Sequence, residues 1–335
     1  MSQSTESTPL RLSLLDLAMV GHGQDTGEAL RESLALAKVA DRTGGFERLW
    51  FAEHHNMPSI ASAATSVLIG QVLAVTDRLR VGAGGVMLPN HSPLVIAEQF
   101  GTLAELYPGR VDLGLGRAPG TDQATLRALR RRPEDAENFP ADIRELQAYL
   151  GPDGAGGIHA TPGRGTNVPL WVLGSSMFGA TLAAAYGLPY AFASHFAPDA
   201  LLPALSAYRE KFQPSAQCER PYAIAALNVI AADSPAEADA RADRVLRGRV
   251  RSLASRMPQF AGDLNHATID ALLASPLGAQ ARHMVSATAV GTAEQVEEYL
   301  RDFRDRTGAD ELMVTNPGPG FAERRRTLEI LATLT

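Results

Sequence analysis

The chain has 335 residues, 45% of them hydrophobic, so it is long enough to bury one large core or two ordinary ones. The net charge is −6 and the arginines are scattered among carboxylates, which argues against nucleic acid as the main ligand. The single cysteine, Cys218, excludes an intramolecular disulfide and offers no thiolate cluster for a metal, so a reducing cytoplasm fits best.

The N-terminal segment is polar, so residues 1–9 are predicted to form a flexible tail ahead of a single domain over residues 10–335. The segment has no apolar centre, and no run of about 18 uncharged apolar residues occurs further along the chain. We therefore expect neither a signal peptide nor a membrane span.

Eight short apolar segments, each bounded by turn residues, follow at residues 10–20, 48–55, 80–88, 111–117, 170–174, 190–196, 222–232 and 311–317. Their length and apolar character predict buried strands. Segments with helical spacing alternate with them, and two of these, residues 28–44 and 93–109, end in a glycine that commonly closes a helix. This alternation predicts parallel pairing and a (β/α)8 TIM barrel.

Two connections are longer than a crossover requires. Residues 151–169 are rich in glycine and proline and predict a flexible surface loop. Residues from about 233 to 292 contain two or three helical segments, so we expect a folded insertion after the seventh strand, near the barrel mouth. Within it, residues from about 256 to 284 are predicted to form a mobile lid that excludes water from the mouth.

Polar residues end five of the predicted strands. These clusters are His54 and His55, residues 87–93, Arg117, residues 174–176 and residues 194–196. In a (β/α)8 barrel the reacting groups lie at the carboxyl ends of the strands, where the loops meet at one mouth. An isolated buried histidine is more often structural than catalytic, but the coincidence of five clusters favours a functional site.

A metal site is one reading of the sequence Glu53–His54–His55. Adjacent histidines on a strand point to opposite faces, so only one of them can point into the mouth, and other strands would have to supply the remaining ligands. No His-x-His pair is present, which makes metal the weaker reading. The further candidate ligands are His91, His195 and Asp112.

Residues 111–120, VDLGLGRAPG, resemble a dinucleotide-binding pattern. Gly114 and Gly116 have the expected spacing, but the third glycine, Gly120, comes one position late and behind Pro119. No later strand ends in an acidic residue that would bind a ribose. This argues against a nicotinamide site and leaves Arg117, whose planar guanidinium is suited to phosphate.

Gly174, Ser175 and Ser176 lie where a strand turns into an alanine-rich helix. Free N–H groups in the first turn of a helix, together with serine hydroxyls, make an anion site. An ordinary N-cap explains one serine but not two. With Arg117 one strand away, the pattern predicts a phosphate monoester whose planar group lies across the mouth.

Four segments carry a family resemblance that spans nearly the whole chain. They are LWFAEHHNMPSIASAATSVLIG, LRVGAGGVMLPNHSPLVIAEQFGTLAELYPGRVDLGLGRAPG, LWVLGSSMFGATLAAAYGLPYAFASHF and VGTAEQVEEYLRDFRDRTGADELMVTN. In these segments the chain resembles the bacterial luciferase-like flavin monooxygenases. The resemblance implies a (β/α)8 barrel that binds reduced FMN and uses O2.

The resemblance also assigns roles to single residues. It places the catalytic histidine on His54, and a histidine whose pKa is near neutrality suits a group that takes or holds a proton beside the reacting oxygen. His55 is then expected to support the site and Glu53 to be a structural partner. The cofactor-binding residues that we expect are Gly85, Arg117, Pro119, Ser175, Ser176, Gly179 and His195.

The family's non-prolyl cis peptide bond falls on Gly84–Gly85. Here the sequence departs from the aldehyde-oxidising luciferases, because two glycines replace larger residues and Gly116 stands where luciferase has a reactive cysteine. These departures leave flavin binding intact but leave light emission and a long-chain aldehyde substrate open.

Three functions remain open at this point. The first is an FMN-dependent monooxygenase that oxygenates a small organic substrate, an aldehyde or similar, with reduced FMN as cosubstrate and a separate NAD(P)H:flavin reductase. The second is a deazaflavin-dependent hydride-transfer enzyme on the same fold, and the third is a non-catalytic flavin-binding subunit. His54 and Arg117 together argue against the third. We further expect a cytoplasmic homodimer that binds neither nucleic acid nor membrane.

Overall fold

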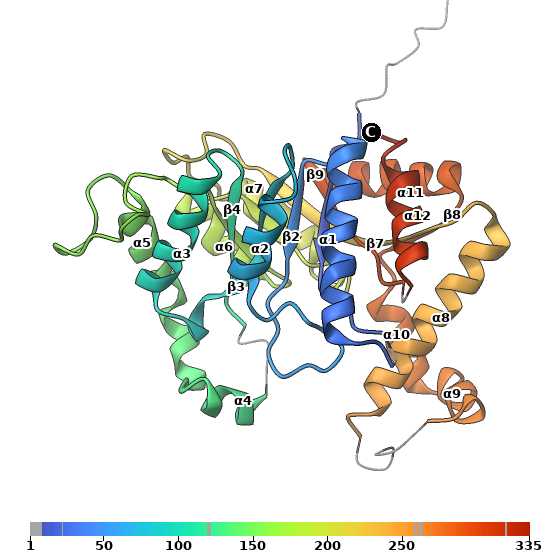
Figure 1. Cartoon of the computed structure of the whole chain (residues 1–335). Coiled ribbons are helices and arrows are strands. Elements are labelled where there is room, and N and C mark those ends of the chain that lie inside the picture. Colours follow the sequence, from blue (N-terminus) through green and yellow to red (C-terminus); the bar gives the residue numbers. More distant parts are fainter. Residues whose placement is uncertain (1–8, 22, 119–121, 258–259, 261–263, 319) are drawn as a thin grey trace, which may run out of the picture.

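The computed structural model describes residues 9–335 except residues 22, 119–121, 258–259, 261–263 and 319 (Figure 1). Residues 1–8 of the predicted tail lie outside the described residues. Among the described helices, none has both the length and the apolar character that crossing a bilayer requires.

Eight parallel strands form a closed ring. In ring order they are β1 (Leu12–Asp16), β2 (Arg48–Phe51), β3 (Arg80–Met87), β4 (Val111–Gly116), β5 (Leu170–Gly174), β6 (Tyr190–Phe192), β7 (Ala223–Ala231) and β9 (Glu311–Thr315). Pairing of β6 with β7, β7 with β9 and β9 with β1 closes the ring. Each strand lies within one of the eight predicted segments, so the (β/α)8 barrel is confirmed.

A ninth strand, β8 (Thr288–Gly291), was not predicted. It pairs outside the ring with the second half of β7, from Asn228 to Ala231, while residues 224–228 of β7 pair with β9. All nine residues of β7 are buried, because the strand is long enough to serve both neighbours. The four residues of β8 at the end of a helical insertion are too short an apolar segment to be predicted as a strand.

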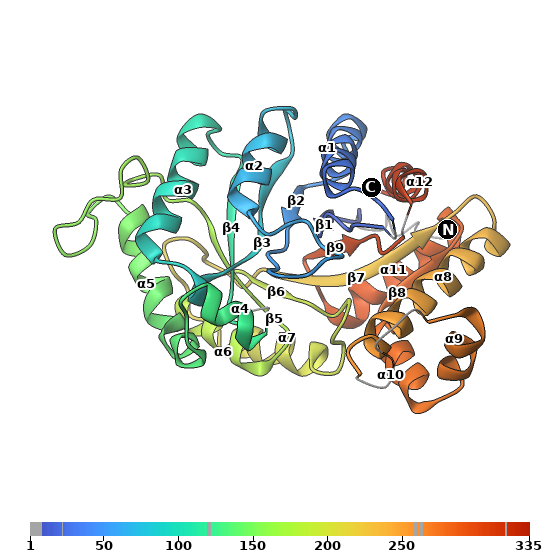
Figure 2. The same ribbon diagram turned by 60° about the horizontal axis from the view of Figure 1, so that its bottom comes forward.

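Helices surround the barrel (Figure 2). They are α1 (Thr26–Thr43), α2 (Thr65–Leu73), α3 (Pro93–Leu106), α5 (Phe139–Leu150), α6 (Met177–Tyr186), α7 (Leu201–Glu210), α11 (Ala293–Thr307) and α12 (Phe321–Leu331). A short helix, α4 (Gln123–Ala128), follows β4, and 3-10 turns form at Leu88–Asn90 and Pro133–Asn138. Helix α1 shows the expected ends: the Asp25 side chain accepts a bond from the N–H of Glu28, and Gly44 closes the helix with φ of 76°.

The insertion after β7 contains three helices. They are α8 (Pro235–Ala254), α9 (His266–Leu273) and α10 (Pro276–Met284), which lie together on one side of the barrel (Figure 2, orange). Val250, Ala254, Ile269 and Ala281 of these helices form a small core of their own together with Leu264, which precedes α9. The fold class is therefore a TIM barrel with a folded insertion after its seventh strand, as predicted.

The connection over residues 151–169 lies at the surface, and part of it is anchored. Ala160 is fully buried, and the backbone of Gly163 packs so closely on Gly101 of α3 that a side chain at Gly101 would collide with it. The glycines that suggested a loose loop therefore include one that permits close packing.

The amino ends of the strands close the bottom of the barrel with a buried ion-pair network. Arg48 donates to Asp112 at 2.8 Å and to Glu311 at 2.8 Å, and the indole N–H of Trp50 donates to Asp112 at 3.2 Å. Asp112 was considered as a metal ligand at the mouth, and this was wrong. It is the second residue of β4, so it lies at the opposite end of the strand from Arg117.

Candidate functional site

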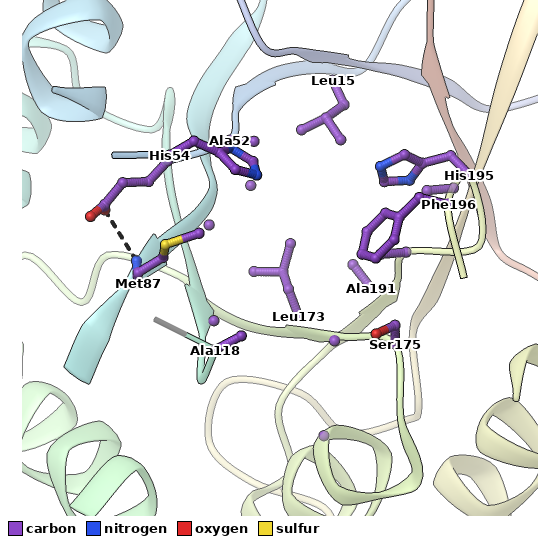
Figure 3. A pocket seen from close by; sticks show the side chains of 18 of the residues that line it. Leu15, Ala52, His54, Met87, Ala118, Leu173, Ser175, Ala191, His195 and Phe196 are labelled. Carbon is purple, nitrogen blue, oxygen red and sulfur yellow. Dashed lines mark hydrogen bonds between the residues drawn. The ribbon is translucent and has the colours of Figure 1, made fainter. Parts of the chain in front are cut away.

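A cavity of about 680 Å³ lies at the carboxyl ends of the barrel strands (Figure 3). Most of its lining is apolar, and its size suits a cofactor together with a small ligand. Seven of the eight predicted site residues line it: His54, Gly85, Arg117, Ser175, Ser176, Gly179 and His195. Pro119 lies outside the described residues.

Two glycines of β3 shape one wall of the cavity. The Gly84–Gly85 peptide bond is cis, which confirms the sequence-based prediction. A side chain at Gly85 would place its Cβ 2.7 Å from the carbonyl oxygen of Gly114 and 2.8 Å from Cδ1 of Leu173. Real Cβ atoms do not come that close to backbone, so the packing requires glycine here and leaves the wall without a side chain.

One end of the cavity is arranged for an anion. Ser176 is the N-cap of α6, with extended backbone and no capping bond from its side chain, so its hydroxyl and the first N–H groups of the helix remain available. The guanidinium of Arg117 lies 4.2 Å from the ring centre of Phe178, in the first turn of the same helix. In the described part of the chain Arg117 has no hydrogen bond or ion pair. Gly179 is buried in this turn, against the Tyr190 ring.

His54 follows the end of β2 and lines the cavity. Its Nδ1 is buried and has no hydrogen-bond partner among the described residues, so this atom can serve a ligand. Burial lowers the pKa of His54 below its ordinary value of 6.5. The ring is therefore neutral at pH 7 and can accept a proton.

His195 follows β6 and lies across the cavity from His54 (Figure 3). Burial lowers the pKa of His195 to about 3, with smaller contributions from Arg249 and His54, so this ring is also neutral. Its Nδ1 likewise lacks a partner within the described residues. The cavity thus holds two neutral imidazoles, each with an unpaired buried nitrogen.

Glu53, His55 and His91 form a separate cluster beside His54. Both imidazoles place Nε2 at 2.7 Å from the same carboxylate oxygen of Glu53, and the N–H of Met87 donates to its other oxygen at 3.1 Å. The Glu53 bond to His55 is the main cause that raises the pKa of His55. The three potential ligand atoms lie within 4.8 Å of one another, but His54 and His195 do not belong to the group. The contacts observed are hydrogen bonds that join the ends of β2 and β3, which supports the structural role expected for Glu53.

Two arginines of the insertion, Arg249 and Arg256, also line the cavity and were not predicted. A signal for Arg249 was present. It lies at the edge of the apolar stripe of α8, next to Val250 and one turn from Leu246 and from Leu253. A charge that borders an apolar stripe is a weak signal, and here it belongs to a side chain that faces the cavity.

The insertion reaches the cavity at both ends of the predicted lid segment, through Arg256 and Met284. Residues 258–259 and 261–263 of this segment lie outside the described residues. We expect the backbone amides of α9 and α10 to exchange hydrogen faster without FMN than with it, because a ligand in the cavity would hold both ends of the segment in place. Hydrogen-exchange mass spectrometry measures this, with α3 as the reference. Equal protection of α9 and α10 in both states would contradict a lid.

Comparison with known proteins agrees with this geometry. Residues 10–311 match the sequence profile of the family described as luciferase-like monooxygenase. A protein of that description from Escherichia coli (strain K12) is 48% identical over 307 residues, which is 91% of each chain.

Two solved structures are similar to this chain over most of its length. The structure of apo-MsnO8 is 33% identical, has a TM-score of 0.84, and is matched over 97% of this chain and 99% of its own. The oxygenating constituent of 3,6-diketocamphane monooxygenase from Pseudomonas putida, solved with FMN, is 16% identical with a TM-score of 0.73 and 97% coverage of both chains; it shows the fold alone. The chain belongs to the luciferase-like monooxygenase family.

Proposed function

We propose that the chain is a flavin-dependent monooxygenase that uses reduced FMN and O2 to oxygenate a small organic substrate. The observation that carries the proposal is that one cavity is lined by two groups that have no polar partner among the described residues: the guanidinium of Arg117, beside the N-terminus of α6, and Nδ1 of the buried, neutral His54. The anionic tail of a cofactor would thus lie at Arg117, while its reacting part would lie near His54 in the same apolar cavity.

The residues present fit FMN. Arg117, Ser175 and Ser176 offer charge and hydroxyl groups to a phosphate at the start of α6. Gly84 and Gly85 leave a wall without side chains, and Leu15, Leu173 and Met313 add apolar surface on which a flat ring can lie. When bound, reduced FMN supplies the electrons with which one atom of O2 enters the substrate and the other leaves as water.

The chain's own residues would then do three things. Arg117 and the helix N-terminus orient the ligand, and the apolar wall excludes water from the reacting centre. His54 holds or accepts a proton at its free Nδ1. Glu53 fixes the backbone around His54 through its bonds to His55, His91 and Met87.

Two measurements test this function. FMN and a deazaflavin cofactor are titrated separately against the purified chain, and product formed under ¹⁸O₂ is analysed by mass spectrometry with reduced FMN supplied. We expect binding of FMN and one labelled oxygen atom in the product. Binding of the deazaflavin alone, with hydride transfer and no label, would replace the proposal by the second function considered above.

We propose that a separate NAD(P)H:flavin reductase supplies the reduced FMN. The purified chain loaded with FMN should oxidise NADH at a negligible rate, because Gly114 lies within β4, where it allows β3 to pack closely, rather than in a turn that could hold a pyrophosphate. Anaerobic stopped-flow absorbance of the flavin band measures the rate. Rapid bleaching by NADH alone would show that the chain reduces its own flavin.

We also propose a homodimer in the cytoplasm. Several large apolar side chains are exposed on the neighbouring helices α2 and α3, including Val67 at 64% and Leu106 at 65% exposure. Burial of such side chains against a second copy would stabilise a dimer.

A further inference from the structure

Arg249 lies in α8 and faces the cavity. Within the described residues it makes no hydrogen bond or ion pair. Three other arginines of this helix each pair with a carboxylate: Arg241 with Glu237, Arg244 with Glu323 and Arg247 with Asp243. These three arginines are neutralised by carboxylates, whereas the side chain of Arg249 lines the cavity.

The environment of Arg249 is unfavourable for an unpaired cation. Burial lowers the pKa of Arg249, and the neighbouring Arg256, which also lines the cavity, lowers it further. A partly buried guanidinium that has no counter-ion among the described residues costs free energy that a bound anion would recover. Arg249 and the more exposed Arg256 thus line one part of the cavity, and no carboxylate of the described lining residues other than Glu53 is available to them, which favours a site for a negative group.

The charges of the whole cavity support the same conclusion. Among the described residues its charged lining consists of Arg117, Arg249, Arg256 and the carboxylate of Glu53, which already accepts bonds from two histidines. The phosphate of one FMN would be met by Arg117 at the start of α6. The two arginines of the insertion would then have no anionic partner within the described lining, and one of them, Arg249, lies near enough to His195 to lower the pKa of that ring.

We propose that Arg249, with Arg256 beside it, binds the carboxylate of the substrate, so that the enzyme acts on small organic acids. This inference rests on the proposed function and specifies its substrate class. A planar guanidinium can hold a carboxylate through two parallel hydrogen bonds, which fixes orientation as well as position. Arg249 lowers the pKa of His195, so this anchor lies near the His195 ring, which faces His54 across the cavity. The apolar part of the acid would lie against the apolar lining.

The test compares 4-phenylbutyrate with its neutral amide, 4-phenylbutanamide, which has the same apolar body. Calorimetric titrations at constant ionic strength are made on the flavin-free and the FMN-loaded chain. The variants are Arg249→Met, Arg249→Lys and, as a control, Arg244→Met, which removes the same charge from the same helix at its Glu323 pair. Thermal melting confirms that each variant is folded.

We expect the wild type and Arg244→Met to prefer the acid over the amide. Arg249→Met should lose about 10–100-fold in affinity for the acid and little for the amide, and Arg249→Lys should lose part of this preference. Equal binding of acid and amide to the wild type, or an unchanged preference in Arg249→Met, would overturn the proposal.

Titrations with FMN and riboflavin separate this site from the phosphate site. We expect Arg249→Met to bind both flavins as the wild type does. A selective loss of FMN affinity would show that Arg249 binds the cofactor phosphate instead. If the wild type binds no FMN at all, the proposed function fails, while the flavin-free titrations still decide whether Arg249 recognises an acid.

Discussion

Replacement of His54 by alanine should lower turnover about 10²–10⁴-fold while FMN affinity stays nearly unchanged. The ring lies at the cavity with a buried, unpaired Nδ1, whereas the groups that would bind phosphate lie at the start of α6. Steady-state product formation with reduced FMN supplied, together with an FMN titration, measures both quantities. His159→Ala is the matched control, because His159 is exposed and lies outside the cavity lining.

The pH dependence of kcat/KM tests whether His54 accepts a proton in the reaction. Burial lowers the pKa of its ring below 6.5, so the ring is neutral at pH 7 and becomes protonated only as the pH falls through that lowered value. If His54 accepts a proton in the reaction, kcat/KM of the wild type should fall in that acid range. The same limb should be missing from the residual activity of His54→Ala. Turnover of the variant equal to that of the wild type would remove His54 from the mechanism.

The barrel was predictable because each of its strands is short, apolar and separated from the next by a helical segment. The strand β8 was not predictable, since its partner is the second half of β7 and its four residues have no pattern that differs from a helix end. The position of a polar residue along its strand also determines whether the residue reaches the cavity. Asp112 and Arg117 are five residues apart, yet one belongs to the ion-pair network at the bottom of the barrel and the other to the cavity.

The strand-end part of the site was predictable, because the carboxyl ends of parallel strands in a barrel meet at one mouth. His54, Arg117, Ser175, Ser176 and His195 are accordingly brought to one cavity. Arg249 and Arg256 of the insertion were missed, because the sequence alone does not show which face of α8 packs toward the cavity.

Contacts between strand ends were missed as well. The hydrogen bond between His91 and Glu53 joins residues 38 positions apart, and no sequence pattern in either segment indicates this contact. Periodicity predicts elements and the fold predicts where strands end, but neither specifies which side chains meet.

Replacement of Arg117 by alanine should weaken FMN binding by about 1.5–3 kcal/mol, the contribution of a charge-assisted hydrogen bond, and should leave riboflavin binding nearly unchanged. Riboflavin lacks the phosphate, so the ratio of the two dissociation constants isolates the contact. Fluorescence titration of both flavins against wild type and variant measures it.

Two further variants separate the possible causes of such a loss. Arg144→Ala removes an exposed arginine that lies 4.1 Å from the Tyr186 ring centre, the same kind of contact that Arg117 makes with Phe178, but outside the cavity lining; it should change neither constant. Arg117→Lys keeps the charge without the planar fork and should recover part of the FMN affinity. An equal loss of FMN and riboflavin in Arg117→Ala would mean that Arg117 supports the cavity wall through Phe178 and does not touch the phosphate.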